Sequence, residues 1–328
     1  MRTFSFGFKA MLLAFGLAAV SFACSKDDDD DNNTPATPTI SQKAAQDADL
    51  SVFVQVLEAT GLTATLNDNS SKFTVFAPTN AAFTQLLTDL GVANLTELVA
   101  AVGIDAVREI VKYHVIGAEV RSSAVTTGYV NTLGVSSTNH NLSMFIDASN
   151  GVKLNNKATV TTVDILASNG VIHKIDKVLL LPTILDLVAA NSNYSSLAAA
   201  VTAAAPNIAA SLADNSVKLT LFAPTNAAFS AALTALNFSS LQELVTTLGV
   251  PQVSNILLYH GLNSQVRAAQ VTAGIKPTLL PNANITIQIN GSTVEILDGA
   301  GRLSQVTATD IQAVNGVIHS INGVLLPQ

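Results

Sequence analysis

Charged residues are scarce in this sequence of 328 residues, where they make up 12% against about 25% in an average soluble protein. The 16 lysines and arginines are outnumbered by 23 aspartates and glutamates, which argues against a basic groove for nucleic acid. A single cysteine excludes an intramolecular disulfide framework and a zinc site built on several thiolates. Tryptophan is absent and aromatic residues amount to 5%, so a sugar-binding surface of stacked rings is not expected.

Apolar residues are plentiful by comparison. They make up 48% of the chain, enough to bury sizeable cores, and the length accommodates two domains of ordinary size. Intrinsic disorder is therefore a poor fit for most of the sequence.

The first 23 residues have the pattern of an export signal. Arg2 and Lys9 give a positive start, residues 10–20 are apolar, and small residues precede Cys24. The pattern resembles a bacterial lipoprotein signal, in which Cys24 is lipidated and becomes the first mature residue. The alternative is an ordinary secretory signal followed by a chance cysteine.

Residues 24–38 are expected to form a linker between this cysteine and the first domain. Five consecutive aspartates at 27–31 repel one another, and the Asn, Thr and Pro residues after them are typical of linkers. Acidic residues after a lipidated cysteine resemble the surface-export tag of Bacteroidota lipoproteins. That resemblance implies a lipid anchor in the outer membrane and a chain that faces the cell exterior; the alternative is a solvated spacer.

The rest of the chain contains an internal repeat. KFTVFAPTNAAF at 72–83 recurs as KLTLFAPTNAAF at 218–229, and NGVIHKI at 169–175 recurs as NGVIHSI at 315–321. The starts move from 72 to 218 and from 169 to 315, an offset of 146 in both cases. A constant offset over such a length indicates a duplicated domain, and each copy should have its own core. We expect domains at 39–182 and 183–328.

Periodicity within a copy predicts helices first and strands later. Thr79 or Asn80 can cap a helix that ends at Gly91, residues 95–102 form a second helix, and Asp105 can cap a third. Strands are expected at 73–76, ended by Pro78, and at 142–147, 152–154, 158–163 and 171–181. This grouping predicts an α+β domain on a mostly antiparallel sheet.

Three motifs in each copy resemble the signature of the fasciclin family. They are the FAPTNAAF box, a Tyr-His pair that follows a helix, and the NGVIHxIxxVLL box, in the same order in both copies. The resemblance covers nearly all of 39–328. It implies two tandem fasciclin-like domains, each a mostly antiparallel β-sandwich or wedge with a layer of short helices. It also implies no cofactor and a role in adhesion or matrix association.

Most residues of the repeated boxes are expected to be structural. Alternation along the strand places His173 and His319 on the apolar side, as buried core histidines. Each copy has two histidines in its repeated boxes and no cysteine, so no metal site is expected. The structural box residues are Phe76, Pro78, Thr79, Asn80, Phe83 and His173 in the first copy, and Phe222, Pro224, Thr225, Asn226, Phe229 and His319 in the second.

The Tyr-His pairs allow two interpretations. In animal fasciclin proteins such a pair, flanked by branched aliphatic residues, has been linked to integrin adhesion, which by resemblance suggests Tyr113, His114, Tyr259 and His260 as an adhesion motif. The expected bacterial host has no integrins. A structural role, in which the pair closes a helix onto the sheet, is therefore favoured.

No catalytic motif is present. The sequence has no Gly-x-Ser-x-Gly elbow, no His-Glu-x-x-His and no phosphate-binding loop, so an enzyme is not expected. The leading hypothesis is a non-enzymatic surface lipoprotein that mediates adhesion or contact with matrix or biofilm, with an extracellular protein or polysaccharide as ligand. A glycan-binding accessory protein for polysaccharide uptake is the first alternative, and a hydrolase is the second.

The junction between the copies is expected to be short. A helix at 184–190 can begin at Thr183, directly after the first copy ends at Pro182. Because this leaves no Gly/Ser-rich tether, we expect little relative motion of the two domains.

Overall fold

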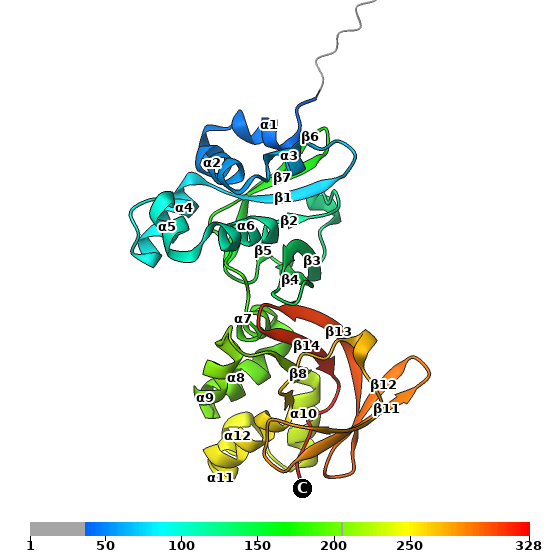
Figure 1. Ribbon diagram of the computed structural model, residues 1–328. Coiled ribbons are helices and arrows are strands. Elements are labelled where there is room, and N and C mark those ends of the chain that lie inside the picture. Colours follow the sequence, from blue (N-terminus) through cyan, green and yellow to red (C-terminus); the bar gives the residue numbers. More distant parts are fainter. Residues whose placement is uncertain (1–36, 205) are drawn as a thin grey trace, which may run out of the picture. The chain divides into compact units, whose positions relative to one another are not determined.

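A computed structural model describes residues 37–204 and 206–328. Thr37–Gln328 forms one compact unit that holds two copies of the same mixed α+β arrangement, which confirms the predicted fold class (Figure 1). The predicted signal, Cys24 and the aspartate run lie outside the described residues. None of the helices in the described part of the chain has both the length and the apolar character needed to cross a membrane.

Short capped helices form one layer of the first copy. Helix α4 starts after Thr79, whose hydroxyl accepts a hydrogen bond from Ala82 N at 3.3 Å, and stops at Gly91 in the left-handed region (φ 68°), as predicted. The third predicted helix begins two residues early, after Gly103, so Asp105 lies in its first turn instead of capping it. The helices are α1 (Ile40–Ala45), α2 (Ser51–Thr60), α3 (Thr63–Asn67), α4 (Asn80–Leu90), α5 (Leu95–Val102) and α6 (Ile104–Tyr113).

One seven-stranded sheet forms the rest of the first copy. Its strands, in hydrogen-bonding order, are β2 (Val115–Ile116), β1 (Phe73–Pro78), β7 (Gly170–Ile175), β6 (Ala158–Ala167), β5 (Lys153–Leu154), β4 (Asn141–Asp147) and β3 (Gly128–Val135). Only the central pair β1–β7 is parallel. Strands β2 and β3, at opposite ends of this order, contact each other, so the sheet curls into a wedge.

Three predicted strand limits are wrong. The closing strand β7 ends at Ile175 instead of residue 181, and β6 continues to Ala167. Strand β1 includes Pro78 as its last residue, whereas the sequence predicts an end at residue 76. This position is allowed because proline lacks only the N–H donor and can still occupy a strand end.

The central strands have a core on each face. Val75 and Ala77 of β1 pack with Phe53 and Leu57 of α2 in the helical layer. Phe76 points the other way, into a second core with Tyr113 and the apolar residues of β4. Because side chains alternate along a strand, one short strand supplies both cores, and both faces of β1 are buried.

The second copy repeats this order (Figure 1). Its helices are α7 (Ile184–Ala190), α8 (Ser195–Ala204), α9 (Pro206–Ala213), α10 (Asn226–Ala235), α11 (Leu241–Leu248) and α12 (Val250–Tyr259). Its sheet runs β10 (Gly274–Pro277), β11 (Asn284–Asn290), β12 (Thr293–Leu297), β13 (Leu303–Ala313), β14 (Gly316–Ile321), β8 (Leu219–Pro224) and β9 (Gly261–Leu262). The N-caps of the first helices, Thr39 and Thr183, are 144 residues apart, whereas the later motifs are 146 residues apart. The second copy therefore has two extra residues between its first helix and β8.

The junction consists of a capped helix without a tether. Thr183 is the N-cap of α7, as the sequence predicts, and it also forms a capping box with Asp186. Tyr129 Oη donates to the Leu187 carbonyl at 2.8 Å, and Gln312 N donates to Ser143 Oγ at 2.9 Å. Residues of both copies therefore hydrogen-bond to each other inside the compact unit.

Candidate functional site

The Tyr-His pair of the first copy lies where helix α6 ends. Val107 and Val111 bury one side of this helix against α2, and Tyr113 is its last residue. His114 follows as the C-cap, and its carbonyl accepts a hydrogen bond from Phe76 N of β1 at 2.9 Å. The pair thus fixes the end of a helix to the central strand of the sheet.

Both ring nitrogens of His114 are used inside the protein. Nδ1 lies 2.7 Å from the Ile110 carbonyl, and Nε2 accepts a hydrogen bond from Leu179 N at 3.0 Å. Nδ1 is therefore the protonated nitrogen of a neutral ring. Burial lowers the pKa of His114 to about 4, so the ring stays neutral at pH 7.

His260 of the second copy has the same surroundings. Its Nδ1 lies 2.7 Å from the Ile256 carbonyl, its Nε2 accepts from Leu325 N at 2.9 Å, and burial lowers its pKa to about 4. Both histidines are 1% exposed. The repeated geometry shows that each ring clamps a helix to the segment after the last strand.

The two tyrosines of the pairs are buried hydrogen-bonding groups. Tyr113 Oη donates to the Ser143 carbonyl at 2.9 Å and accepts from Asn155 Nδ2 at 2.7 Å. Tyr259 Oη donates to the Asn284 carbonyl at 2.5 Å and accepts from Gly299 N at 2.8 Å. Burial raises the pKa of both phenols. Tyr113 and Tyr259 are 0% and 1% exposed, so both phenol rings serve contacts inside the domain.

His173 and His319 lie on the last strand of each sheet and are each 2% exposed, in agreement with the alternation of the sequence. His173 Nε2 lies 3.0 Å from the Val120 carbonyl, and its Nδ1 accepts from Asp164 N at 3.2 Å. The ring stacks on Phe76 with 5.6 Å between centroids. His319 repeats this arrangement with Val266, Asp310 and Phe222, and burial lowers its pKa.

Asparagine and threonine of the FAPTNAAF box have separate tasks. Thr79 caps α4, whereas Asn80 accepts a hydrogen bond from Val52 N at 2.9 Å and donates to the Ala48 carbonyl at 2.9 Å, which secures the start of α2. In the second copy Thr225 caps α10 and Asn226 secures α8 in the same way. The remaining box residues, Phe76, Pro78, Phe83, Phe222, Pro224 and Phe229, are buried.

Sequence reasoning missed two buried asparagines. Asn169 accepts from Ile40 N at 2.8 Å and donates to the Leu66 carbonyl at 2.9 Å, so it ties the first helices to the start of β7. Asn315 does the same with Ile184 and Leu212. Both asparagines are the first residue of the NGVIH box, and this repetition could have indicated a structural role. Asparagine before glycine is also common in turns, however, so the pattern alone does not indicate burial.

No metal centre is formed by the described residues. Across 37–204 and 206–328, no three His, Cys, Asp or Glu side chains gather closely enough to hold a metal ion. Because the four box histidines are each engaged with backbone groups, their nitrogens hold the fold together.

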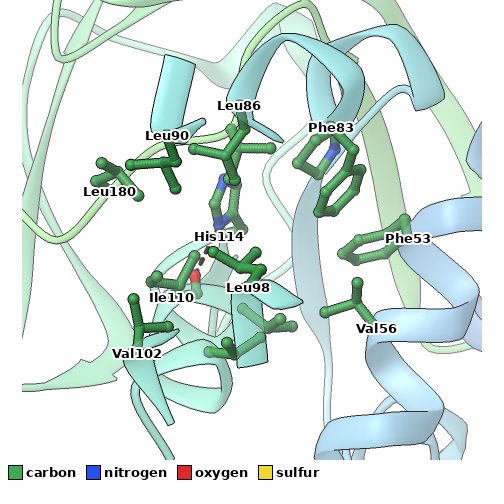
Figure 2. Close-up of a pocket in the computed structure, with 14 residues that line it drawn as sticks. Phe53, Val56, Phe83, Leu86, Leu90, Leu98, Val102, Ile110, His114 and Leu180 are labelled. Carbon is green, nitrogen blue, oxygen red and sulfur yellow. Dashed lines mark hydrogen bonds between the residues drawn. The ribbon is translucent and has the colours of Figure 1, made fainter. Parts of the chain in front are cut away.

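An apolar cavity of about 120 Å³ lies beneath α4, α5 and α6 in the first copy (Figure 2). Phe53 and Phe83 form one side of it, Leu86 and His114 another, and Leu98 and Ile110 lie opposite Leu86. His114 is the one ring with polar atoms in the wall, and its nitrogens are already hydrogen-bonded. The cavity therefore offers apolar contact but no free hydrogen-bonding group.

The chain is similar to proteins of one family throughout both copies. It is 28% identical to transforming growth factor-beta-induced protein ig-h3 of Sus scrofa over 79% of this chain and 35% of that protein. It is 30% identical to human periostin over 79% of this chain and 29% of that protein, so it spans about a third of their lengths. Protein sll1483 of Synechocystis is 34% identical over 44% of this chain and 73% of that protein.

A solved structure shares the fold. It is a FAS1 domain pair from the insect cell adhesion molecule fasciclin I, with a TM-score of 0.50, 20% identity, and coverage of 85% of this chain and 97% of that one. The fasciclin domain family matches residues 48–182 and 192–327, more than half of the chain. With two matched segments, repeated motifs and the shared fold, the chain belongs to the fasciclin domain family.

Proposed function

We propose that this protein is a lipid-anchored cell-surface protein whose paired fasciclin domains mediate adhesion or contact with extracellular matrix or biofilm. The observation that carries the proposal is the tandem pair of family domains, which has the fold of a domain pair from an insect cell adhesion molecule. A pair of rigidly built domains suits the recognition of an extended protein or polysaccharide outside the cell.

The state of the histidines supports a non-enzymatic role. A general base needs a ring nitrogen that is free to exchange a proton with substrate. His114, His173, His260 and His319 are all buried, and each is bound to backbone groups through both nitrogens. The adhesion surface consequently consists of side chains other than the Tyr-His pairs.

Binding assays with the purified chain test this proposal. Beads coated with the full chain should be retained on biofilm material, and beads coated with a heat-unfolded sample of the same chain serve as the control. Equal retention of both samples would remove the support for adhesion. Selective binding to one sugar on a glycan array would instead favour capture of polysaccharide for uptake.

A further inference from the structure

The apolar cavity of the first copy is larger than its counterpart in the second. The second cavity lies at the same place, between α10, α11 and α12, but has only about 30 Å³ against about 120 Å³ in the first. Ala200 and Ala232 replace the larger Val56 and Leu86 in its wall. Smaller side chains around a smaller space mean that the walls lie closer together in the second copy.

Three exposed aliphatic side chains lie on one side of the first cavity (Figure 2). Leu90, Val102 and Leu180 all line it, and they are 45%, 45% and 47% exposed. Their counterparts Leu236, Leu248 and Leu326 are only partly exposed. The first copy therefore presents a hollow with an apolar rim, which we call the α4–α6 cavity, and the matching hollow of the second copy is smaller and has a less exposed rim.

The size and chemistry of the α4–α6 cavity limit what it can hold. An engineered apolar cavity of about 150 Å³ stays dry and binds benzene, or about 25 Å³ per carbon atom. By this measure 120 Å³ accommodates about five carbons. A charged or hydrogen-bonding group would lose its water without gaining a partner, because both nitrogens of His114 are occupied.

The rim distinguishes a hydrocarbon chain from a peptide. An extended peptide across Leu90, Val102 and Leu180 would bury backbone N–H and C=O groups against side chains that offer no hydrogen bonds. An alkyl chain has no polar group along its length, so it can fill the cavity with its end and cover the rim with the carbons that follow. We propose that the α4–α6 cavity binds the end of an unbranched alkyl chain of a free single-chain amphiphile, with its head group in solvent.

Methyl NMR of the full chain, titrated with 1-butanol, 1-pentanol, 1-hexanol and 1-octanol, tests this inference. Methyl signals of Leu86, Leu98 and Val107 should shift, while those of Leu244 and Val253 in the second copy act as an internal control. Affinity should rise about fourfold for each added methylene while carbons still enter the cavity. Shifts of equal size in both copies, or no shift with any alcohol, would overturn the proposal.

Two variants distinguish the contribution of the cavity to alcohol affinity from that of its rim. Val111→Leu copies Leu257, which occupies the matching place in the second copy. Because it removes room for one of about five carbons, it should weaken pentanol, hexanol and octanol about fourfold and leave butanol, whose four carbons still fit, nearly unchanged. Leu180→Ser at the exposed rim should weaken octanol but leave butanol unchanged. If Val111→Leu does not fold, its methyl spectrum will show this. Leu180→Ser then still tests whether the alkyl chain crosses the rim.

Two further results would contradict the proposal. Unchanged octanol affinity in Leu180→Ser would mean that the chain does not cross the rim. Shifts of the same methyl groups on simple concentration of the protein, without alcohol, would mean that a second copy covers the rim instead. Neither result bears on adhesion, because the inference does not rest on the proposed function.

Discussion

At the residue scale, the phenol of Tyr113 satisfies two buried groups, the Ser143 carbonyl and the Asn155 amide. Tyr113→Phe would remove a hydrogen-bond partner from both groups in the core, which should lower the free energy of unfolding by about 1–3 kcal/mol. Urea denaturation at pH 7 measures the change. Tyr259→Phe should act in the same direction in the second copy, and midpoints identical to that of the unmodified chain would refute the structural role of both rings.

The buried histidines make stability dependent on pH. The pKa values of His114 and His260 are about 4 in the folded chain, whereas an unfolded histidine has the ordinary value of 6.5. Between these values the unfolded chain binds more protons, so the free energy of unfolding should fall as the pH is lowered from 6.5 to 4. The slope should reach up to about 1.4 kcal/mol per pH unit for each histidine.

A variant that cannot titrate isolates this effect from that of carboxylates such as Asp186, whose pKa is also shifted. The stability of His114→Gln should fall less steeply between pH 6.5 and 4 than that of the unmodified chain. Urea denaturation at several pH values measures both slopes. The absolute stability of the variant does not matter for the comparison. An unchanged slope would show that His114 does not titrate on unfolding.

At the element scale, the parallel pair of central strands, β1–β7 in the first copy and β8–β14 in the second, depends on one glycine in each copy. Gly170 has φ 145°, and a Cβ atom there would lie 1.9 Å from the Phe73 carbonyl oxygen. Gly170→Ala should therefore push the central strands apart and lower stability by about 3 kcal/mol or more. Thermal unfolding followed by circular dichroism measures this.

Gly91 provides the matched control for this substitution. It also has positive φ, 68°, but a Cβ atom there would meet nothing within 4 Å. Gly91→Ala should cost only about 1–2 kcal/mol, because it strains the backbone without a clash. If Gly170→Ala were no more harmful than Gly91→Ala, close approach of the two strands would not explain the glycine.

Local signals were sufficient to predict several elements. The helix Asn80–Leu90 could be predicted because its cap and its glycine stop lie next to it in the sequence. Strand β3, Gly128–Val135, was missed because Gly128, Asn131 and Gly134 interrupt its alternation. Residues 178–181 were assigned to β7 because they are apolar, but Leu179 enters a core without pairing in a strand.

The candidate site could be predicted only in part, because many of its contacts are made by segments far apart in the sequence. The helical stripe indicates that His114 faces inward, yet its partner Leu179 N is contributed by a distant segment. Asn155 and Asn169 are fully enclosed by contacts that no local pattern reports. The cavity could not be foreseen, because its volume depends on how closely three helices approach one another.

At the scale of the whole molecule, attachment to the membrane should depend on Cys24. Each buried methylene contributes about 0.8 kcal/mol, so a lipoprotein with two or three acyl chains stays on the membrane. Cys24→Ser should release the protein or leave it unprocessed, as cell fractionation and N-terminal sequencing would show. A cleaved Cys24→Ser protein that remains with the membrane would contradict the lipid anchor.

Relative motion of the two copies is a second property of the whole molecule. Thr183 starts α7 directly after the first copy, and Tyr129 and Ser143 hydrogen-bond to residues of the second. We expect small-angle scattering of the full chain to fit a narrow distribution of distances between the domains. A broad distribution would identify the junction as a free hinge.

Retention of living cells under flow tests adhesion most directly. Cells that carry the full chain should remain attached to biofilm-coated glass at shear rates that remove cells lacking it. Cells with the Cys24→Ser chain should detach like the cells that lack it. If cells with and without the protein detach equally, although surface proteolysis confirms its display, the adhesion function proposed for the paired fasciclin domains is wrong.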